Sequence, residues 1–255
     1  MRLITLLILM VLNATIYATS SASSLLTDNQ RLESRILAYA LQYRVYLPNG
    51  YDETKRYPVI YFADGQWFLS AGNVVSVLDT QIESGQIMPI IAVFVDSRNP
   101  DKPKQNRRNK QFMCNRDYLH FFVNELVPEI NGKYSASLDR RQRIIAGLSF
   151  GGLNAACFGV MASDVFGGIA MLSPASDQHL KLVSDIYETS KEDELMVFLS
   201  AGKRNDNLRA IRKFHKLLKR KGHEINYHEV PFGHNWKNWQ PLLDDVLQTF
   251  FKLPE

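Results

Sequence analysis

The chain contains a serine whose surroundings predict a nucleophile. Ser149 lies in the Gly-x-Ser-x-Gly pentapeptide 147–151, directly after the apolar run 144–146 and before the helix-compatible segment 153–161. A strand, a sharp turn and a helix in this order expose a serine hydroxyl at the apex of the turn. Because the bare pentapeptide also occurs in ordinary glycine-rich turns, the prediction depends on the flanking strand and helix.

A base and an orienting acid are expected further along the chain. A serine hydroxyl is a weak nucleophile until a base removes its proton, and histidine is the usual base. Of the six histidines, His234 follows the last predicted strand, and Asp206 follows the strand before it. The order Ser149, Asp206, His234 is that of α/β-hydrolases. The alternatives are an N-cap role for Asp206, before the predicted helix 208–221, and a surface-loop role for His234.

The tetrahedral intermediate of acyl transfer needs two N–H donors at its oxyanion. The backbone N–H of Phe150, directly after the serine, is the first expected donor. The second is expected from the loop after the predicted strand 57–63, where the backbone N–H of Gln66 is the expected donor. Loss of one such donor typically costs roughly 3 kcal/mol of transition-state stabilisation. This chemistry requires no metal and no cofactor.

The elements needed to position these residues follow from alternating apolar strands and amphipathic helices. Strands are predicted at 41–47, 57–63, 89–95, 142–146, 168–172, 194–200 and 225–230, and helices at 71–84, 117–134, 176–189, 208–221 and 239–251. This alternation predicts a three-layer α/β fold with a mostly parallel sheet and helices on both faces. A single domain is expected over 39–255, after a polar lead-in over 23–38, with no large lid.

The first 22 residues have the pattern of a signal peptide. Arg2 precedes the apolar run 3–12, and small residues follow at 18–22. Cleavage after Ala22 is expected, with Ala18 as the alternative. The apolar run is short for a membrane span, so an exported, periplasmic or secreted protein is predicted rather than an anchored one.

Composition excludes some classes of function. The chain has 255 residues, 45% of them hydrophobic and 22% charged, with a formal net charge of +4. These values are typical of a soluble globular protein, and no motif indicates nucleic-acid binding. The oligomeric state is left open. An exported protein could join Cys114 and Cys157 in a disulfide, but a buried free thiol is the favoured expectation for Cys157.

Five motifs, in order and at suitable spacing, give the chain a resemblance to a known family. They lie at 46–51, 57–66, 125–134, 147–152 and 233–239. Together they resemble the esterase D superfamily, which includes enterochelin esterases, periplasmic siderophore esterases, feruloyl esterases and mycolyltransferases. The resemblance implies an α/β-hydrolase fold and serine-ester chemistry at Ser149 and His234, with Gln66 and Phe150 as oxyanion donors. It leaves the acid open, because relatives place it nearer the glycine than Asp206 lies from Gly202.

The expected substrate is a small-molecule ester. Arg107 and Arg108 belong to a basic stretch that could attract an anionic substrate such as a catecholate siderophore, and Trp67 and Trp236 could stack on an aromatic ring. The alternatives are a solvated loop and core tryptophans. The predicted function is therefore an exported serine hydrolase of carboxylic esters. Acyl transfer to a sugar or other alcohol, and non-catalytic binding on a hydrolase scaffold, are the alternatives.

Overall fold

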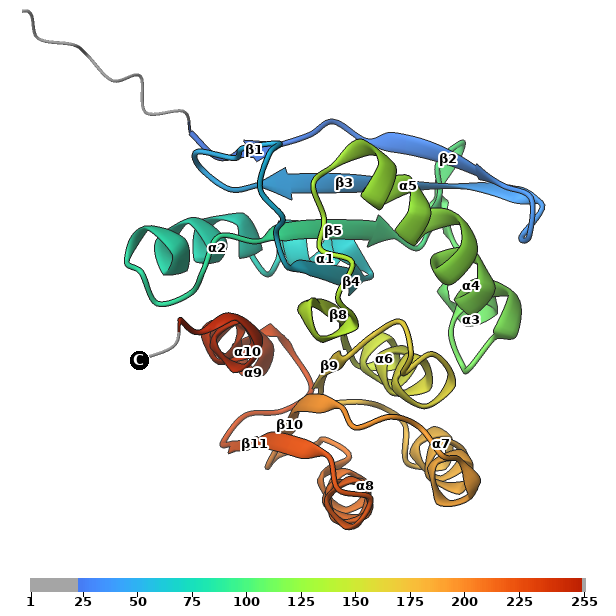
Figure 1. Ribbon diagram of the computed structural model, residues 1–255. Helices are drawn as coiled ribbons and strands as arrows, with labels where there is room; N and C mark the ends of the chain where they lie inside the picture. The colour runs from blue at the N-terminus through green and yellow to red at the C-terminus, as the bar shows by residue number, and fades with distance from the viewer. Residues whose placement is uncertain (1–22, 254–255) are drawn as a thin grey trace, which may run out of the picture.

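A twisted sheet forms the centre of the molecule (Figure 1). The computed structural model describes residues 23–253, and within them nine strands form the sheet in the order β1-β3-β5-β4-β8-β9-β10-β11, with β2 also paired to β3. The strands are β1 (Leu25–Leu26), β2 (Gln30–Ser34), β3 (Tyr39–Leu47), β4 (Val59–Ala63), β5 (Ile91–Asp96), β8 (Arg143–Leu148), β9 (Gly168–Leu172), β10 (Met196–Gly202) and β11 (Glu224–Val230). The predicted signal peptide, residues 1–22, lies outside the described residues.

The middle of the sheet is parallel and apolar. The six strands β5, β4, β8, β9, β10 and β11 run parallel to one another in the described sheet. Every residue of β4, β5, β8 and β9 is buried, as expected for strands covered on both faces. Because parallel strands end at the same edge, the loops that follow them meet there.

Helices cover both faces of this sheet, which gives the predicted three layers (Figure 1). One face carries α1 (Gly65–Ser70), α2 (Val74–Glu83), α9 (Trp236–Trp239) and α10 (Leu243–Phe251), and the other carries α4 (Arg116–Phe121), α5 (Val127–Lys133), α6 (Phe150–Met161), α7 (Asp177–Thr189) and α8 (Leu208–Arg220). The apolar side chains between layers form two clusters, one on each side of the sheet. No helix among residues 23–253 is long and apolar enough to cross a membrane.

The N-terminal segment differs from the loose lead-in expected over 23–38. Strands β1 and β2 both pair antiparallel with β3, which itself pairs antiparallel with β5. Alternate residues of β2 are exposed and polar, so the sequence of this strand resembles that of a loop. The segment therefore extends the sheet at its first edge.

The helix predicted at 117–134 is interrupted. A π-helical turn, Phe122–Leu126, separates α4 from α5. Pro128 lies in the first turn of α5 and has no N–H for the carbonyl four residues earlier, which accounts for a local change of hydrogen bonding. Phe121, Phe122, Leu126 and Ile130 are all buried, so the predicted apolar face still packs on the core.

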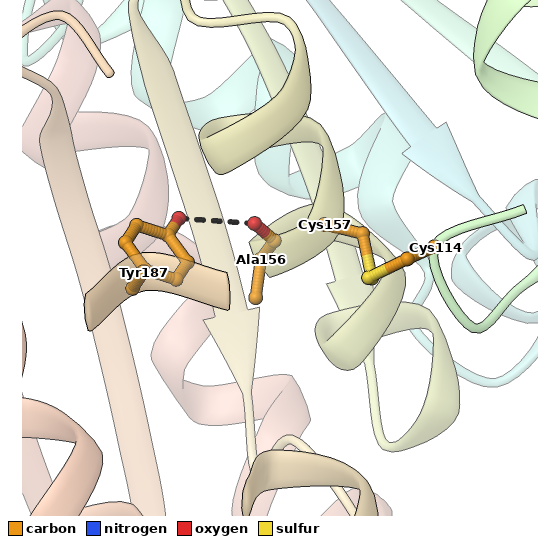
Figure 2. Close-up of a disulfide and its surroundings, with 4 residues drawn as sticks. All are labelled: Cys114, Ala156, Cys157 and Tyr187. Atoms are coloured by element: carbon orange, nitrogen blue, oxygen red, sulfur yellow. Dashed lines mark hydrogen bonds between the residues drawn. A yellow bond between two sulfur atoms is a disulfide. The ribbon is translucent and has the colours of Figure 1, made fainter. Parts of the chain in front are cut away.

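The cysteines form a disulfide, which corrects the expectation of a free thiol at Cys157. Cys157 lies on α6 and Cys114 lies in the segment after the short helix α3 (Arg108–Gln111) (Figure 2). The basic stretch before Cys114, which includes β6 (Arg98–Asn99) and β7 (Lys102–Asn106), ends in a segment that packs on the protein, with Phe112 buried against Phe150. That packing brings Cys114 to Cys157, and sequence periodicity does not report it.

Removing this disulfide is expected to destabilise the protein. The bond joins residues 43 apart, and a closed loop of that length restricts the unfolded chain by about 4 kcal/mol. A Cys114→Ala/Cys157→Ala variant should therefore unfold roughly 10 °C lower in a calorimetric scan. Reductant should lower the unfolding temperature of the wild type towards that of the variant and leave the variant unchanged. Equal unfolding temperatures without reductant would contradict the prediction.

Candidate active site

Ser149 lies at the sharp turn between β8 and α6. Its backbone has φ 54° and ψ −121°, a conformation that L-residues rarely adopt. The turn is tight, because a Cβ on Gly147 would lie 2.2 Å from the carbonyl oxygen of Gly151. The Ser149 N–H donates to the carbonyl of Leu172 on β9 (2.8 Å), which fixes the turn against the neighbouring strand. The hydroxyl is thereby held at the carboxyl edge of the sheet.

His234 reaches this hydroxyl from the loop after β11. Its Nε2 lies 2.7 Å from Oγ of Ser149, although 85 residues separate the two in sequence. The imidazole is packed edge-on against Trp239, with ring centroids 5.0 Å apart. The side chain is 28% exposed, so Nε2 faces a site that a substrate can enter. The ring can accept the serine proton in this geometry.

Asp206 lies behind the imidazole. Its Oδ1 is 3.0 Å from Nδ1 of His234, and its side chain has no exposed surface. The carboxylate also accepts hydrogen bonds from the backbone N–H groups of Gly202 and Asn207, both at 2.7 Å. The N-cap of α8 is Asn207 rather than Asp206. The carboxylate thus bonds the imidazole of His234 in addition to backbone N–H groups, and it is not the N-cap side chain of α8.

The hydrogen bonds to Asp206 decide its charge. Burial raises the pKa of this carboxyl, but hydrogen bonds from His234, Ser173 and two backbone N–H groups outweigh burial and leave the pKa below its ordinary value. Asp206 is therefore ionised at neutral pH. An ionised acceptor at Nδ1 keeps the proton on that nitrogen and leaves Nε2 free to act as a base.

The two residues expected to donate to an oxyanion begin neighbouring helices. Phe150 is the first residue of α6, and Gln66 is the second residue of α1, positions whose N–H groups have no partner within their own helix. The helix starts are close, because a Cβ on Gly151 would lie 3.4 Å from Oδ2 of Asp64. Gly65 is required where α1 begins, since a Cβ there would lie 2.5 Å from the backbone of Phe94 on β5.

Asp64, a buried acid that the sequence did not predict as a site residue, holds this loop. The side chain of Asp64 is fully buried, and its oxygens accept from Oγ of Ser97 (2.6 Å) and from Nε of Arg108 (2.8 Å). Burial raises the pKa of Asp64, while the Arg108 cation opposes that change. The available signal was the Asp-Gly pair directly after a buried strand.

A cleft of about 240 Å³ opens onto Ser149. Its lining includes Trp67, Arg108, Ser149, His234, Trp236 and Trp239. The structure therefore brings the predicted residues Trp67, Trp236 and Arg108 to the serine, together with Trp239 of the last motif. A larger hollow of about 520 Å³ between α7 and α8 lies away from Ser149 and contains none of these residues.

Arg107 is placed elsewhere, which corrects its predicted role beside the substrate. Its guanidinium lies over the ring of Tyr39, 4.3 Å from the centroid, and donates to the carbonyl of Ala40 (2.9 Å). The described lining of the cleft includes Arg108 and not Arg107. The turn into α3 sends these neighbouring side chains in different directions, so the basic stretch supplies one cation to the site.

Residues 23–253 contain no group of three or more histidine, cysteine or acidic side chains that could hold a metal ion. The residues gathered at the cleft are instead a serine, a histidine, an acid and aromatic rings. This arrangement can perform nucleophilic attack on a carbonyl.

Comparison with known proteins identifies the family. A family model described as "Putative esterase" matches residues 34–250. The chain belongs to this esterase family. Membership makes it a carboxylic ester hydrolase and confirms the resemblance stated above.

Relatives of this esterase are distant in sequence. It is 26% identical over 219 residues to the uncharacterized protein YjcH of Bacillus subtilis (strain 168), a match that covers 80% of this chain and 88% of that protein. It is 24% identical over 153 residues to an iron(III) enterobactin esterase of Yersinia enterocolitica, covering 58% of this chain and 42% of the relative. The matched region thus spans less than half of that enterobactin esterase.

A solved structure confirms the fold of the esterase. A ferulic acid esterase superposes with a TM-score of 0.71 at 22% identity, covering 91% of this chain and 98% of that chain. The predicted α/β-hydrolase fold, a mostly parallel sheet between helices, is therefore confirmed.

Proposed function

We propose that this esterase cleaves carboxylic esters through an acyl-enzyme on Ser149. The observation that carries the proposal is the 2.7 Å contact between Nε2 of His234 and Oγ of Ser149, with Asp206 on the opposite ring nitrogen. Nucleophile, base and orienting acid then form one hydrogen-bonded chain, which is the arrangement that activates a serine.

The proposed reaction has two halves. His234 takes the hydroxyl proton as Oγ of Ser149 attacks the ester carbonyl, and the N–H groups of Phe150 and Gln66 stabilise the oxyanion. The C–O bond to the alcohol breaks, and His234 returns the proton to the leaving oxygen. A water molecule then gives a proton to His234 and attacks the acyl carbon. The bond from the acyl carbon to Oγ of Ser149 breaks, His234 returns the proton to Oγ, and the acid is released.

The proposed substrate is an ester with an aromatic group. Three indole rings, Trp67, Trp236 and Trp239, line the cleft, and such rings stack on aromatic groups. One relative is named for iron(III) enterobactin, and one structural neighbour is named for ferulic acid. Both observations support an aryl, feruloyl-type or catecholate siderophore ester.

The esterase is further proposed to be exported. The leader-like residues 1–22 support export, and so does the disulfide between Cys114 and Cys157, because such bonds persist in oxidising compartments. A periplasmic or secreted location fits both observations.

Covalent labelling tests the proposed nucleophile. The protein beginning at Ser23 should react with a fluorophosphonate to give a single adduct, located at Ser149 by peptide mass spectrometry. The rate of 4-nitrophenyl acetate hydrolysis should fall in proportion to the fraction of protein that is labelled. Heat-unfolded protein should not react, because the serine then lacks its base. An adduct on another residue, or full activity of the labelled protein, would contradict the proposal.

A further inference from the structure

Arg108 presents unused hydrogen-bond donors to the cleft. The Nε of its guanidinium donates to the carboxylate of Asp64 (2.8 Å). Among the described residues 23–253, no hydrogen bond is formed by either terminal nitrogen of Arg108. The side chain is 25% exposed, and it lines the same cleft as Ser149. The two terminal amino groups are therefore available to a bound molecule.

The guanidinium is held in place before any ligand arrives. Its carbon lies 5.7 Å from the ring centroids of both Phe112 and Phe150. Asp64 fixes its Nε, and the disulfide at Cys114 ties the segment after α3 to α6. A side chain that is already ordered loses little entropy on binding, which strengthens its contacts with a ligand.

Acidic groups do not compete for these donors. None of the described residues that line the cleft is acidic. Asp64 and Asp206 lie next to it, but both side chains are fully buried and bonded, Asp64 to Ser97 and Arg108, and Asp206 to His234. The free face of the guanidinium is thus the charged group that a ligand in the cleft would meet.

The position of Arg108 indicates which part of an ester it would contact. His234 reaches Ser149 from the side of β10 and β11, and the leaving alcohol must lie beside its Nε2 to receive the proton. Arg108 lies on the opposite side, because it bonds to Asp64 at the end of β4, and β4 and β10 lie on opposite sides of β8 in the sheet. A group bound by Arg108 therefore belongs to the acyl part.

We propose that Arg108 is a specificity-determining residue that binds a carboxylate on the acyl group of the ester. The preferred substrates are then half-esters of dicarboxylic acids, especially aromatic ones that also contact the indole rings. Terminal guanidinium nitrogens bind the two oxygens of a carboxylate together, with geometric selectivity that a neutral amide lacks. The inference rests on the proposed serine esterase function and adds a substrate class to it.

A matched pair of substrates tests the inference. The 4-nitrophenyl esters of 3-carboxybenzoic and 3-carbamoylbenzoic acid have nearly the same shape and differ in charge. The wild type should prefer the carboxylate in kcat/KM by about 10- to 100-fold, the range expected for hydrogen bonds to a charged group. In Arg108→Gln this ratio should fall towards one, and Arg108→Lys should restore part of it.

The neighbouring arginine supplies the control. Arg107→Gln removes the same charge from the same stretch, but Arg107 lies over Tyr39, so the ratio should stay at its wild-type value. Equal hydrolysis of both esters by the wild type would overturn the role of Arg108 and leave the esterase proposal standing. An equal loss of both activities in Arg108→Gln would also overturn it, because that pattern indicates a structural role. Hydrolysis of neither ester by the folded wild type would count against the serine esterase proposal itself.

Discussion

Ser149→Ala is expected to lower kcat for ester hydrolysis by about 10⁴- to 10⁶-fold. The substitution removes the oxygen that lies 2.7 Å from His234 and leaves the base without a proton to take. The proposed oxyanion donors at Phe150 and Gln66 remain, so a small residual rate above that of water is expected. The measurement is initial-rate kinetics with a 4-nitrophenyl ester on purified variant and wild type.

The folded state of this variant should be unchanged. Alanine accepts the backbone conformation at 149 about as poorly as serine does, so the unfolding temperature should stay close to that of the wild type. Ser184→Ala on α7 is the matched control, because its hydroxyl donates to the carbonyl of Leu180 in its own helix (2.7 Å). Wild-type turnover by Ser149→Ala would show that another residue is the nucleophile.

Asp206→Asn is expected to lower kcat by about 10³- to 10⁴-fold. The amide nitrogen of asparagine can donate to Nδ1 of His234 and so move the imidazole proton to Nε2, where it blocks removal of the serine proton. The pKa of Asp206 is below its ordinary value, so the wild-type group is ionised throughout the range from pH 6 to 9. The activity deficit of the variant should accordingly persist across that range.

A surface aspartate provides the comparison for this experiment. Asp164→Asn changes the same functional group at an exposed position away from the cleft, and its kcat should match the wild type. If Asp206→Asn retained more than about a tenth of the wild-type kcat, Ser149 and His234 would be working as a pair with little help from the acid.

The fold was predictable from sequence where burial leaves a strong pattern. Strands such as β4 and β8 are apolar along their whole length, and the loops after them contain the residues that meet at the cleft. The edge strand β2 was missed because a strand exposed on alternate residues is as polar as a loop. Its pairing with β3 is a long-range property that local composition does not report.

The site was predictable only to the level of chain order and strand ends. Ser149, Asp206 and His234 each follow a strand, and the structure places them in contact. The different directions of Arg107 and Arg108 depend on the turn into α3, and the disulfide depends on packing against α6. Both features arise from tertiary contacts, which spacing along the chain does not encode.

The backbone at residue 149 has a consequence for how this protein can change over time. A non-glycine residue at φ 54° and ψ −121° costs of order 1–3 kcal/mol, and glycine would avoid most of that cost. The substitution that best relieves the turn is therefore one that deletes the proposed nucleophile. Selection for thermal robustness alone would drive the chain towards an inert scaffold, so a serine is maintained at this position only while its chemistry is under selection.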